Sequence, residues 1–391
     1  MPKEGVLIPI GPYHPAIKEP EFFKLIVEGE NVVDADIRIG YNHRGIEYLA
    51  QRMTYHQVTF LVERICGICS NIHPLCYVQA VESILNLRPP ERALYIRSII
   101  EELERIHSHL LWLGVGGHVI GFDTLLMWTW KLREYVLDVF EEITGNRQSY
   151  AMMKIGGVRR DIRAEHRQKI LKVMDEVERG VKQIAAMLLE DPVSRARLEG
   201  VGVLTKEEAG NYCVVGPTAR ASGLPIDVRK DFPHAAYSML SFEVPVRTEG
   251  DVLAKTIVRI EEMLQSAEIV RQAVDAMPGG DIEVEFKEMV PGEGVGVAEA
   301  PRGEDFHYVV SDGTNYPKRH KVRAPTYMNL PSLKPQLIGY SLADAPIIIA
   351  SIDPCLCCTD RLSVVDRREG RRKAYSWDEL VYLSRRKTRR R

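Results

Sequence analysis

The sequence predicts an α+β protein: a central antiparallel helical bundle with small β-sheets contributed by the N- and C-terminal regions. Apolar residues recur at three- and four-residue steps along four long segments in the middle of the chain, the pattern of helices with one buried face. Short β-type runs separated by glycine and proline occupy both ends. A Cys-x-x-Cys motif lies near each end, at Cys66/Cys69 and Cys355/Cys358, so a shared site would bring the two ends together.

Composition limits the class of protein. The chain has 391 residues, 45% of them hydrophobic and 27% charged, which is ordinary for a globular protein. The formal net charge of −2 gives no bias toward nucleic acid. The apolar runs are too short to span a bilayer, and the N-terminus lacks the pattern of a secretory signal, so we expect an intracellular protein. Without repeats or low-complexity linkers, residues 1–391 are expected to form one domain.

The N-terminal region, residues 1–65, is predicted to be rich in β-structure. Residues 6–10, 22–27 and 32–39 read as strands, and Glu28-Gly29-Glu30-Asn31 predicts a hairpin turn between the last two. The proline-rich loop between the first two strands carries Glu19. A helical stretch then leads to the first cysteine pair.

Residues 66–280 are predicted to form the helical bundle. The four helices are expected at residues 91–113, 124–143, 161–189 and 252–277. Gly114 with Gly116-Gly117, Gly145 and Pro278-Gly279-Gly280 are the predicted stop signals.

The C-terminal region changes character again. In the mixed segment 281–361, residues 282–286, 296–300, 306–311 and 319–322 read as strands, and 346–352 is an apolar run before the second cysteine pair. The tail, residues 362–391, is strongly basic. We interpret it as a solvated tail, with contact to an acidic partner or an anionic membrane surface as the alternative.

The cysteines carry the chemistry. The count of seven, with no secretory signal, argues against a disulfide framework. One Cys-x-x-Cys is a weak signal, because a redox dithiol, half of a zinc site or two buried thiols all fit it. Two such pairs favour a metal, and four thiolates suit structural zinc or an iron–sulfur cluster.

Longer motifs point to a family. Glu63-Arg64-Ile65-Cys66-Gly67-Ile68-Cys69 with His73, and Asp353-Pro354-Cys355-Leu356-Cys357-Cys358, resemble the large subunit of [NiFe] hydrogenases. The finer pattern is similar to the membrane-bound, energy-converting group that includes formate hydrogenlyase, Ech and Mbh enzymes. The likeness covers nearly the whole chain, including Arg44-Gly45-Ile46-Glu47, Gly156-Gly157-Val158-Arg159-Arg160-Asp161 and Glu299-Ala300-Pro301-Arg302-Gly303. The quinone-site large subunit of respiratory complex I shares this scaffold but lacks the four cysteines.

The resemblance implies a nickel–iron centre whose iron carries CO and cyanide. Cys66 and Cys355 would be terminal ligands of nickel, and Cys69 and Cys358 would bridge the two metals. Glu47 matches a glutamate of a second metal site, usually magnesium. In many relatives a histidine completes that second site, but Arg361 stands at this position here.

Further residues receive roles from the resemblance. Glu19 would transfer protons and Arg302 would hold its cation over the cluster; otherwise they would be an exposed loop carboxylate and a surface arginine. Pro325, Thr326 and Asp353 fall in motifs that wall the pocket and bind cyanide. His73 either orients the first cysteine loop or is an ordinary core histidine. Cys357 stands where serine is more usual, and we expect it to point away from its neighbours.

The resemblance therefore implies the catalytic subunit of a membrane-bound, energy-converting [NiFe] hydrogenase. It would reduce protons to H2 reversibly and have no Fe–S cluster of its own. Electrons from ferredoxin or formate would arrive through a [4Fe–4S] small subunit, and membrane subunits would translocate ions. The expected location is the cytoplasmic face of the cell membrane, as a peripheral subunit. The alternatives are a nickel-free, complex I-like or sulfur-reducing subunit that shapes a quinone or polysulfide pocket, and a structural four-thiolate zinc protein.

Overall fold

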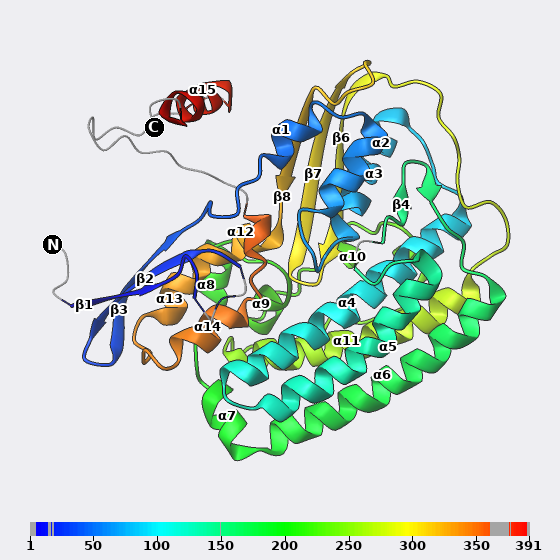
Figure 1. The fold of residues 1–391 in the computed structure, drawn as a ribbon. Coiled ribbons are helices and arrows are strands. Elements are labelled where there is room, and N and C mark those ends of the chain that lie inside the picture. Colours follow the sequence, from blue (N-terminus) through cyan, green and yellow to red (C-terminus); the bar gives the residue numbers. More distant parts are fainter. Residues whose placement is uncertain are drawn as a thin grey trace.

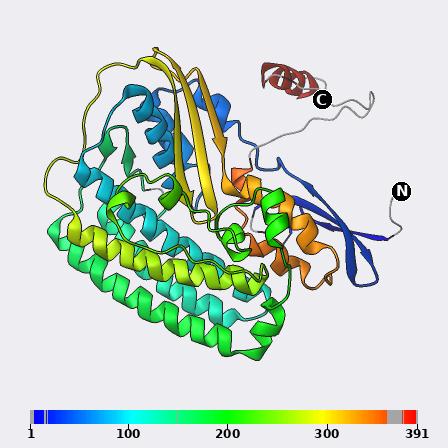
Figure 2. The ribbon, with the colours of Figure 1, turned by 180° about the vertical axis from the view of Figure 1, so that it is seen from behind.

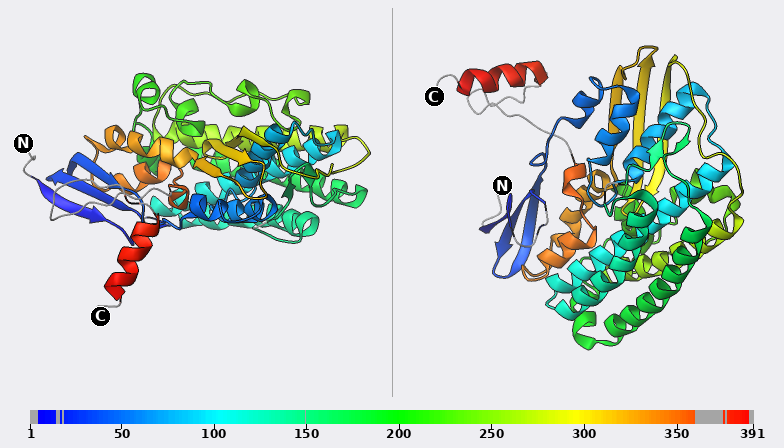
Figure 3. Two further views of the ribbon diagram at one scale, coloured as in Figure 1. Left: turned by 90° about the horizontal axis from the view of Figure 1, so that it is seen from above. Right: turned by 45° about the vertical axis from the view of Figure 1, so that its right-hand side comes forward.

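The N-terminal sheet is antiparallel and packs against helices of the C-terminal region. The computed structural model describes residues 5–14, 17, 19–148, 150–359, 375 and 377–388. Strand order is β1-β2-β3, formed by β1 (Val6–Ile10), β2 (Phe22–Glu28) and β3 (Asn31–Arg38). Alternate residues of β2 are buried, as period-two patterning requires. They pack with α13 (Leu333–Leu337) and α14 (Ala345–Ser351), so the blue and orange segments lie side by side in Figures 1 and 3.

Four long helices form the body of the protein. They are α4 (Glu91–Val119), α5 (Asp123–Thr144), α6 (Ala164–Glu190) and α11 (Val252–Ala276). α4 contacts α5 and α11, and α6 contacts the same two helices, which closes the bundle (Figures 1 and 2). Within the described residues, no helix is both long enough and apolar enough to cross a bilayer.

The predicted end of the first long helix is wrong. Gly114, Gly116 and Gly117 lie inside α4, which continues to Val119. A Cβ at Gly114 would lie 2.3 Å from Thr129 Oγ1, and one at Gly117 would lie 2.8 Å from Leu125 Cδ2. These glycines therefore allow α5 to approach closely and do not end the helix.

The C-terminal sheet packs on a short helix. It has the order β6-β7-β8, formed by β6 (Pro291–Ala300), β7 (Gly303–Asp312) and β8 (Arg319–Arg323), and lies against α3 (Ile72–Leu85). A Cβ at Gly296 would lie 1.8 Å from the Cys76 carbonyl oxygen, so glycine is needed for this contact.

The expectation of a strand at residues 282–286 is wrong. This segment makes only an isolated bridge, Gly157↔Glu283, because its neighbour β5 (Gly157–Val158) is too short to extend the pairing. The apolar run at 346–352 folds mainly as α14. The remaining elements are α1 (Ile46–Ala50), α2 (Tyr55–Glu63), β4 (Met153–Lys154), α7 (Pro192–Leu198), α8 (Lys206–Asn211), α9 (Gly216–Ala221), α10 (Val228–Asp231), η1 (Tyr237–Met239), α12 (Pro325–Asn329), η2 (Leu330–Ser332), η3 (Leu356–Cys358) and α15 (Trp377–Thr388).

The fold class is confirmed: helices dominate, and small antiparallel sheets come from both terminal regions. The division into regions 1–65, 66–280, 281–361 and 362–391 stays a prediction. Arg361 and much of the basic tail lie outside the described residues.

Candidate metal centre

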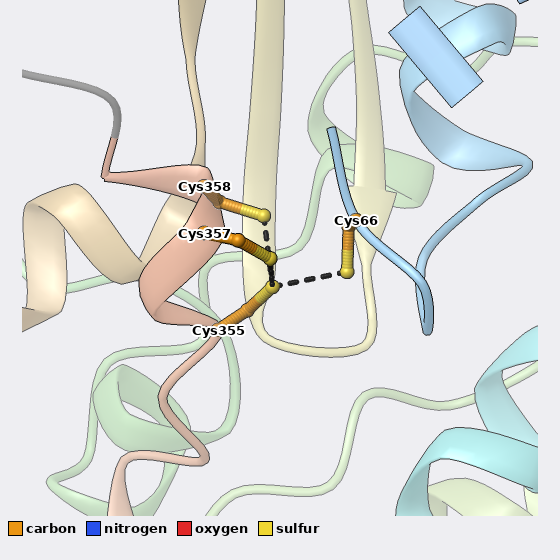
Figure 4. Close-up of side chains that lie close together, drawn as sticks. All are labelled: Cys66, Cys355, Cys357 and Cys358. Atoms are coloured by element: carbon orange, nitrogen blue, oxygen red, sulfur yellow. Dashed lines mark hydrogen bonds between the residues drawn. The ribbon is translucent and has the colours of Figure 1, made fainter. Parts of the chain in front are cut away.

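The two cysteine pairs meet in one buried pocket between the bundle and the two sheets. Cys66 Sγ lies 3.0 Å from Cys355 Sγ and 3.3 Å from Cys69 Sγ, and Cys355 Sγ lies 2.9 Å from Cys358 Sγ. All four side chains are buried. Figure 4 shows the side chains of Cys355, just before η3, and of Cys357 and Cys358, within η3, facing Cys66 from the opposite loop.

The first cysteine loop, residues 64–71, joins α2 to α3. Its thiol Cys66 Sγ accepts hydrogen bonds from two backbone amides, Ile68 N at 3.3 Å and Cys69 N at 3.2 Å. The buried Glu104 side chain of α4 accepts from Asn71 N at 2.7 Å and Ile72 N at 3.2 Å. Glu104 therefore satisfies amides at the start of α3, and it fixes the loop between two helices.

The second cysteine loop, residues 353–358, is held by side chains from distant segments. The hydroxyl oxygen of Thr326, the second residue of α12, accepts from Cys355 N at 3.0 Å. Just before the loop, Trp112 Nε1 donates to the Ala350 carbonyl at 2.6 Å, and Arg259 Nη2 donates to the Ser351 carbonyl at 3.0 Å. The buried Pro325 occupies the first turn of α12, where its fixed φ suits a helix start.

Arg302 lies inside the pocket, so the surface alternative does not hold. Its Nε donates to the Asp353 carbonyl at 2.7 Å, its Nη2 to Asp353 Oδ1 at 2.8 Å, and its Nη1 to Ser108 Oγ at 3.0 Å. Asp353 has φ 53, a left-handed conformation that is uncommon for a non-glycine residue. Nη1 also lies 3.4 Å from Cys69 Sγ. The turn between β6 and β7 thus brings a cation to the thiols.

Cys357 does not point away from its neighbours, which corrects the expectation of a bystander. Its Sγ lies 3.4 Å from Cys355 Sγ (Figure 4). Its thiol donates to Glu19 Oε1 at 2.9 Å, and its backbone amide donates to Glu19 Oε2 at 2.7 Å. The structure therefore brings the Glu19 carboxylate to the second cysteine loop through a residue that sequence reasoning had set aside.

Arg44 connects the two loops. Its guanidinium donates to the Arg64 and Ile65 carbonyls of the first loop, both at 2.8 Å, and to the Cys357 carbonyl of the second at 3.2 Å. The motif containing Arg44 was noticed in the sequence, but nothing local indicates which carbonyls it reaches.

His73 bonds deeper into the sheet as well as to the pocket. Its Nε2 lies 3.6 Å from Cys358 Sγ, and its Nδ1 lies 2.8 Å from Asp305 Oδ2 on β7. Against the desolvation of burial, His73 and His307 hold the pKa of Asp305 well below its usual value. Sequence reasoning missed Asp305 and His307, which lie far along the chain from His73.

The Glu47 side chain makes its hydrogen bonds to β8. Its Oε2 accepts from Lys321 Nζ at 2.6 Å and its Oε1 from Val322 N at 3.1 Å, which ties α1 to β8. An ammonium thus neutralises the carboxylate in this structure. A magnesium site at Glu47 stays a prediction.

The thiols are electrically unequal. Contacts from Cys355, Cys357 and Cys358 lower the pKa of Cys66 well below its usual value, despite burial. Against the contacts from Cys355 and Cys358, the Cys66 contact and burial raise the pKa of Cys69 to about 11. Although desolvation opposes it, Asp353 and the thiols raise the pKa of Arg302 well above its usual value. The pocket therefore favours a thiolate beside a fixed cation.

These donors fit a soft transition metal. Buried thiolates bind nickel, iron or zinc in preference to hard cations. Asp353 Oδ2 is buried and has no hydrogen-bond partner among the described residues, so the pocket wall keeps one polar atom available to a bound group. The donor set is consistent with the nickel–iron centre that the resemblance implies, and also with a single-metal site.

Comparisons with known proteins agree with this geometry. The family model described as "Respiratory-chain NADH dehydrogenase, 49 Kd subunit" matches residues 119–292 and 285–361, and the model "Nickel-dependent hydrogenase" matches residues 44–114, which include Cys66 and Cys69. The membrane-bound hydrogenase subunit alpha of Pyrococcus furiosus is 44% identical over 98% of this chain and 93% of its own. Formate hydrogenlyase subunit 5 of Escherichia coli is 40% identical over 98% of this chain and 68% of its own.

A solved structure shares most of the fold. The membrane-bound sulfane sulfur reductase, an archaeal respiratory membrane complex, contains a chain that superposes with a TM-score of 0.88 at 33% identity. The match covers 92% of this chain and all of the other. The chain therefore belongs to the oxidoreductase family that unites the large subunits of nickel-dependent hydrogenases with the 49-kDa subunit of respiratory NADH dehydrogenase.

Proposed function

We propose that this chain is the catalytic subunit of a membrane-bound, energy-converting [NiFe] hydrogenase that reduces protons to H2 reversibly. One observation carries the proposal: Cys66, Cys69, Cys355 and Cys358 meet in a buried pocket although the two loops lie 289 residues apart. Simple thiol packing would not explain why a buried arginine lies 3.4 Å from one of these sulfurs. The similarity to a membrane-bound hydrogenase subunit and to a formate hydrogenlyase subunit supports the same interpretation.

Cys66, Cys69, Cys355 and Cys358 would hold a nickel–iron centre of the kind that the resemblance implies, with CO and cyanide on its iron. When bound, that centre supplies the reversible conversion of protons and electrons to H2. The chain surrounds it with a buried pocket, where electrostatic interactions are stronger than in water. Arg302 would stabilise negative charge at Cys69 and fix Asp353 in the wall with Thr326 and Pro325.

Glu19 would accept and release protons at the second loop. Its carboxylate already receives the hydrogen bonds of the Cys357 thiol and amide. A carboxylate so placed can exchange protons between a buried thiol and the exterior.

Electron transfer would need a partner. Five of the seven cysteines lie in the pocket, while Cys76 is buried in α3 and Cys213 is exposed. An iron–sulfur cluster needs about four thiolates, so a [4Fe–4S] small subunit would deliver electrons that come from ferredoxin or formate. Membrane subunits would translocate ions, and this chain would lie on the cytoplasmic side of the membrane.

The second candidate is a sulfur-reducing or complex I-like subunit that shapes a polysulfide or quinone pocket. The specific observation behind it is the close fold match to the membrane-bound sulfane sulfur reductase. Metal analysis and infrared spectroscopy of the purified complex separate the candidates. Nickel with CO and cyanide bands supports the hydrogenase. Their absence together with polysulfide or quinone reduction supports the second candidate, and zinc alone supports a structural site.

Replacing Glu19 by glutamine tests the proton role. The Glu19→Gln variant should lose H2 turnover while nickel content and infrared bands remain, because glutamine keeps the shape but cannot carry the proton. Glu30→Gln, in the exposed β2–β3 turn, is the matched control and should retain turnover. Wild-type turnover in Glu19→Gln would remove Glu19 from the proton route.

A further inference from the structure

The pocket contains a second set of four thiols besides the two Cys-x-x-Cys pairs. The sulfur atoms of Cys66, Cys355, Cys357 and Cys358 all lie within 4.8 Å of one another. Cys69 is not a member of this set. Three of the four thiols come from the second cysteine loop, Cys355 just before η3 and Cys357 and Cys358 within it, and only Cys66 comes from the first loop (Figure 4).

The spacing suits one tetrahedral ion. Thiolates at about 2.3 Å from a tetrahedral zinc ion are about 3.8 Å from one another. The contacts here are 3.0 Å for Cys66–Cys355, 2.9 Å for Cys355–Cys358 and 3.4 Å for Cys355–Cys357. Sulfur shifts of about 1 Å or less would therefore convert these contacts into a four-thiolate shell.

Charge distinguishes Cys357 from Cys69 as the fourth ligand. Cys69 Sγ shares its surroundings with the Arg302 cation, 3.4 Å away, and this cation would repel a divalent ion. Cys357 Sγ instead donates to the Glu19 carboxylate at 2.9 Å. That carboxylate attracts a cation and can receive the proton that the thiol releases when it binds metal.

We propose that the pocket binds a single soft divalent ion of the zinc class through Cys66, Cys355, Cys357 and Cys358, with Cys69 outside the ligand shell. This site is distinct from the proposed nickel–iron site, in which Cys357 has no part. The two sites share three ligands, so the single ion and the bimetallic centre exclude each other.

The test uses the full-length chain, reduced and freed of metal under anaerobic conditions. Co²⁺ is added first, because thiolate-to-cobalt absorption reports sulfur ligation, and Zn²⁺ then displaces it to give the affinity. Cys357→Ser should weaken Zn²⁺ binding at least about tenfold and reduce the cobalt absorption. Cys69→Ser should keep both within about twofold. Cys213→Ser, at an exposed position, is the control for cysteine loss in general.

X-ray absorption of the zinc-loaded wild type and Cys357→Ser should give four and three sulfur ligands, respectively. In the wild type, Zn²⁺ should protect the partly exposed Cys357 from alkylation, while the exposed Cys213 should stay reactive with and without Zn²⁺. This wild-type measurement decides the question even if Cys357→Ser fails to fold.

Three results overturn the proposal: loss of binding in Cys69→Ser with retention in Cys357→Ser, alkylation of Cys357 in the zinc-loaded wild type, or no tetrathiolate site in the wild type. None of them bears on the nickel and infrared analysis of the purified complex. The zinc site and the proposed hydrogenase function are therefore tested by separate measurements.

Discussion

The two cysteine loops have the same Cys-x-x-Cys spacing but are stabilised in different ways. The first loop is anchored by helices: it follows α2, precedes α3, and has its amides satisfied by Glu104 of α4. The second loop has little regular structure of its own beyond η3. Side chains from α12, the β6–β7 turn and the N-terminal loop hold its backbone, and side chains from α4 and α11 hold the end of α14 just before it. Asp353 within the loop is in the left-handed region.

This difference indicates how the pocket is assembled. The first loop is held mainly by α3 and the bundle, with Arg44 as a further contact, whereas the second needs both sheets and the bundle to be in place. Arg44 donates hydrogen bonds to both loops and so links them in the folded protein. We therefore expect substitutions around the second loop to lower the free energy of unfolding more than substitutions around the first loop do.

The largest effect is expected at Arg302. Arg302→Met leaves the buried Asp353 carboxylate without its cation, and breaking a buried pair costs about 3–5 kcal/mol. Urea unfolding of the full-length chain measures this free energy. Arg302→Lys keeps the charge but loses the planar guanidinium, so its free energy of unfolding should lie between those of the wild type and Arg302→Met. A free energy of unfolding within about 1 kcal/mol of wild type in Arg302→Met would show that the second loop does not depend on this pair.

Glu104 tests the first loop. Glu104→Ala leaves the Asn71 and Ile72 amides without their acceptor, and we expect a loss of about 2–3 kcal/mol in the free energy of unfolding. Glu104→Gln retains one acceptor oxygen and should lose about half as much. Equal losses in Glu104→Ala and Arg302→Met would abolish the contrast between the loops.

Glu21, beside the second loop, is expected to make the free energy of unfolding depend on pH. Burial raises the pKa of Glu21 to about 7 from the ordinary 4.5, although its contact with the Thr359 hydroxyl, at 3.3 Å just after the second loop, opposes the shift. Below pH about 4.5, Glu21 is protonated in both the folded and the unfolded protein. As the pH rises from about 4.5 to 7, the unfolded chain releases this proton first, so the free energy of unfolding falls. Above pH about 7, Glu21 is ionised in both states and the free energy of unfolding levels off.

After allowance for solvent screening, the decline is expected to be about 1–2 kcal/mol. Glu21→Gln should remove it, while the exposed Glu30→Gln should keep it. Urea unfolding at pH 5 and pH 7.5 provides the measurement. An unchanged pH dependence in Glu21→Gln would assign the decline to other groups.

Trp112 gives the smallest expected effect. Trp112→Phe removes the 2.6 Å hydrogen bond to the Ala350 carbonyl but keeps a ring beneath Arg259, whose Cζ lies 4.1 Å from the Trp112 ring centroid. We expect a loss of about 1 kcal/mol, seen in thermal or urea unfolding. Trp130→Phe, at a position 43% exposed, should change stability little. If both variants unfold alike, the bond to Ala350 contributes nothing measurable.

Much of the fold could be predicted because its signals are local. Periodicity located the long helices, and the Glu28–Asn31 turn located the β2–β3 hairpin. The failures arose where contacts between distant segments decide. Gly114 reads as a stop signal along the sequence, but its contact with Thr129 makes it a packing residue. Residues 282–286 have strand composition without a partner long enough to pair with.

The site divides in the same way. Residue types and spacing alone determined that two thiol pairs from opposite ends could share a metal, because thiolates at that spacing can face one ion. Only the tertiary structure decided that Cys357 also faces the pocket, that Arg302 lies beside Cys69, and that Glu47 bonds to Lys321. The direction of a side chain in a tight turn, and the charge next to it, depend on segments hundreds of residues away, and no local pattern encodes them.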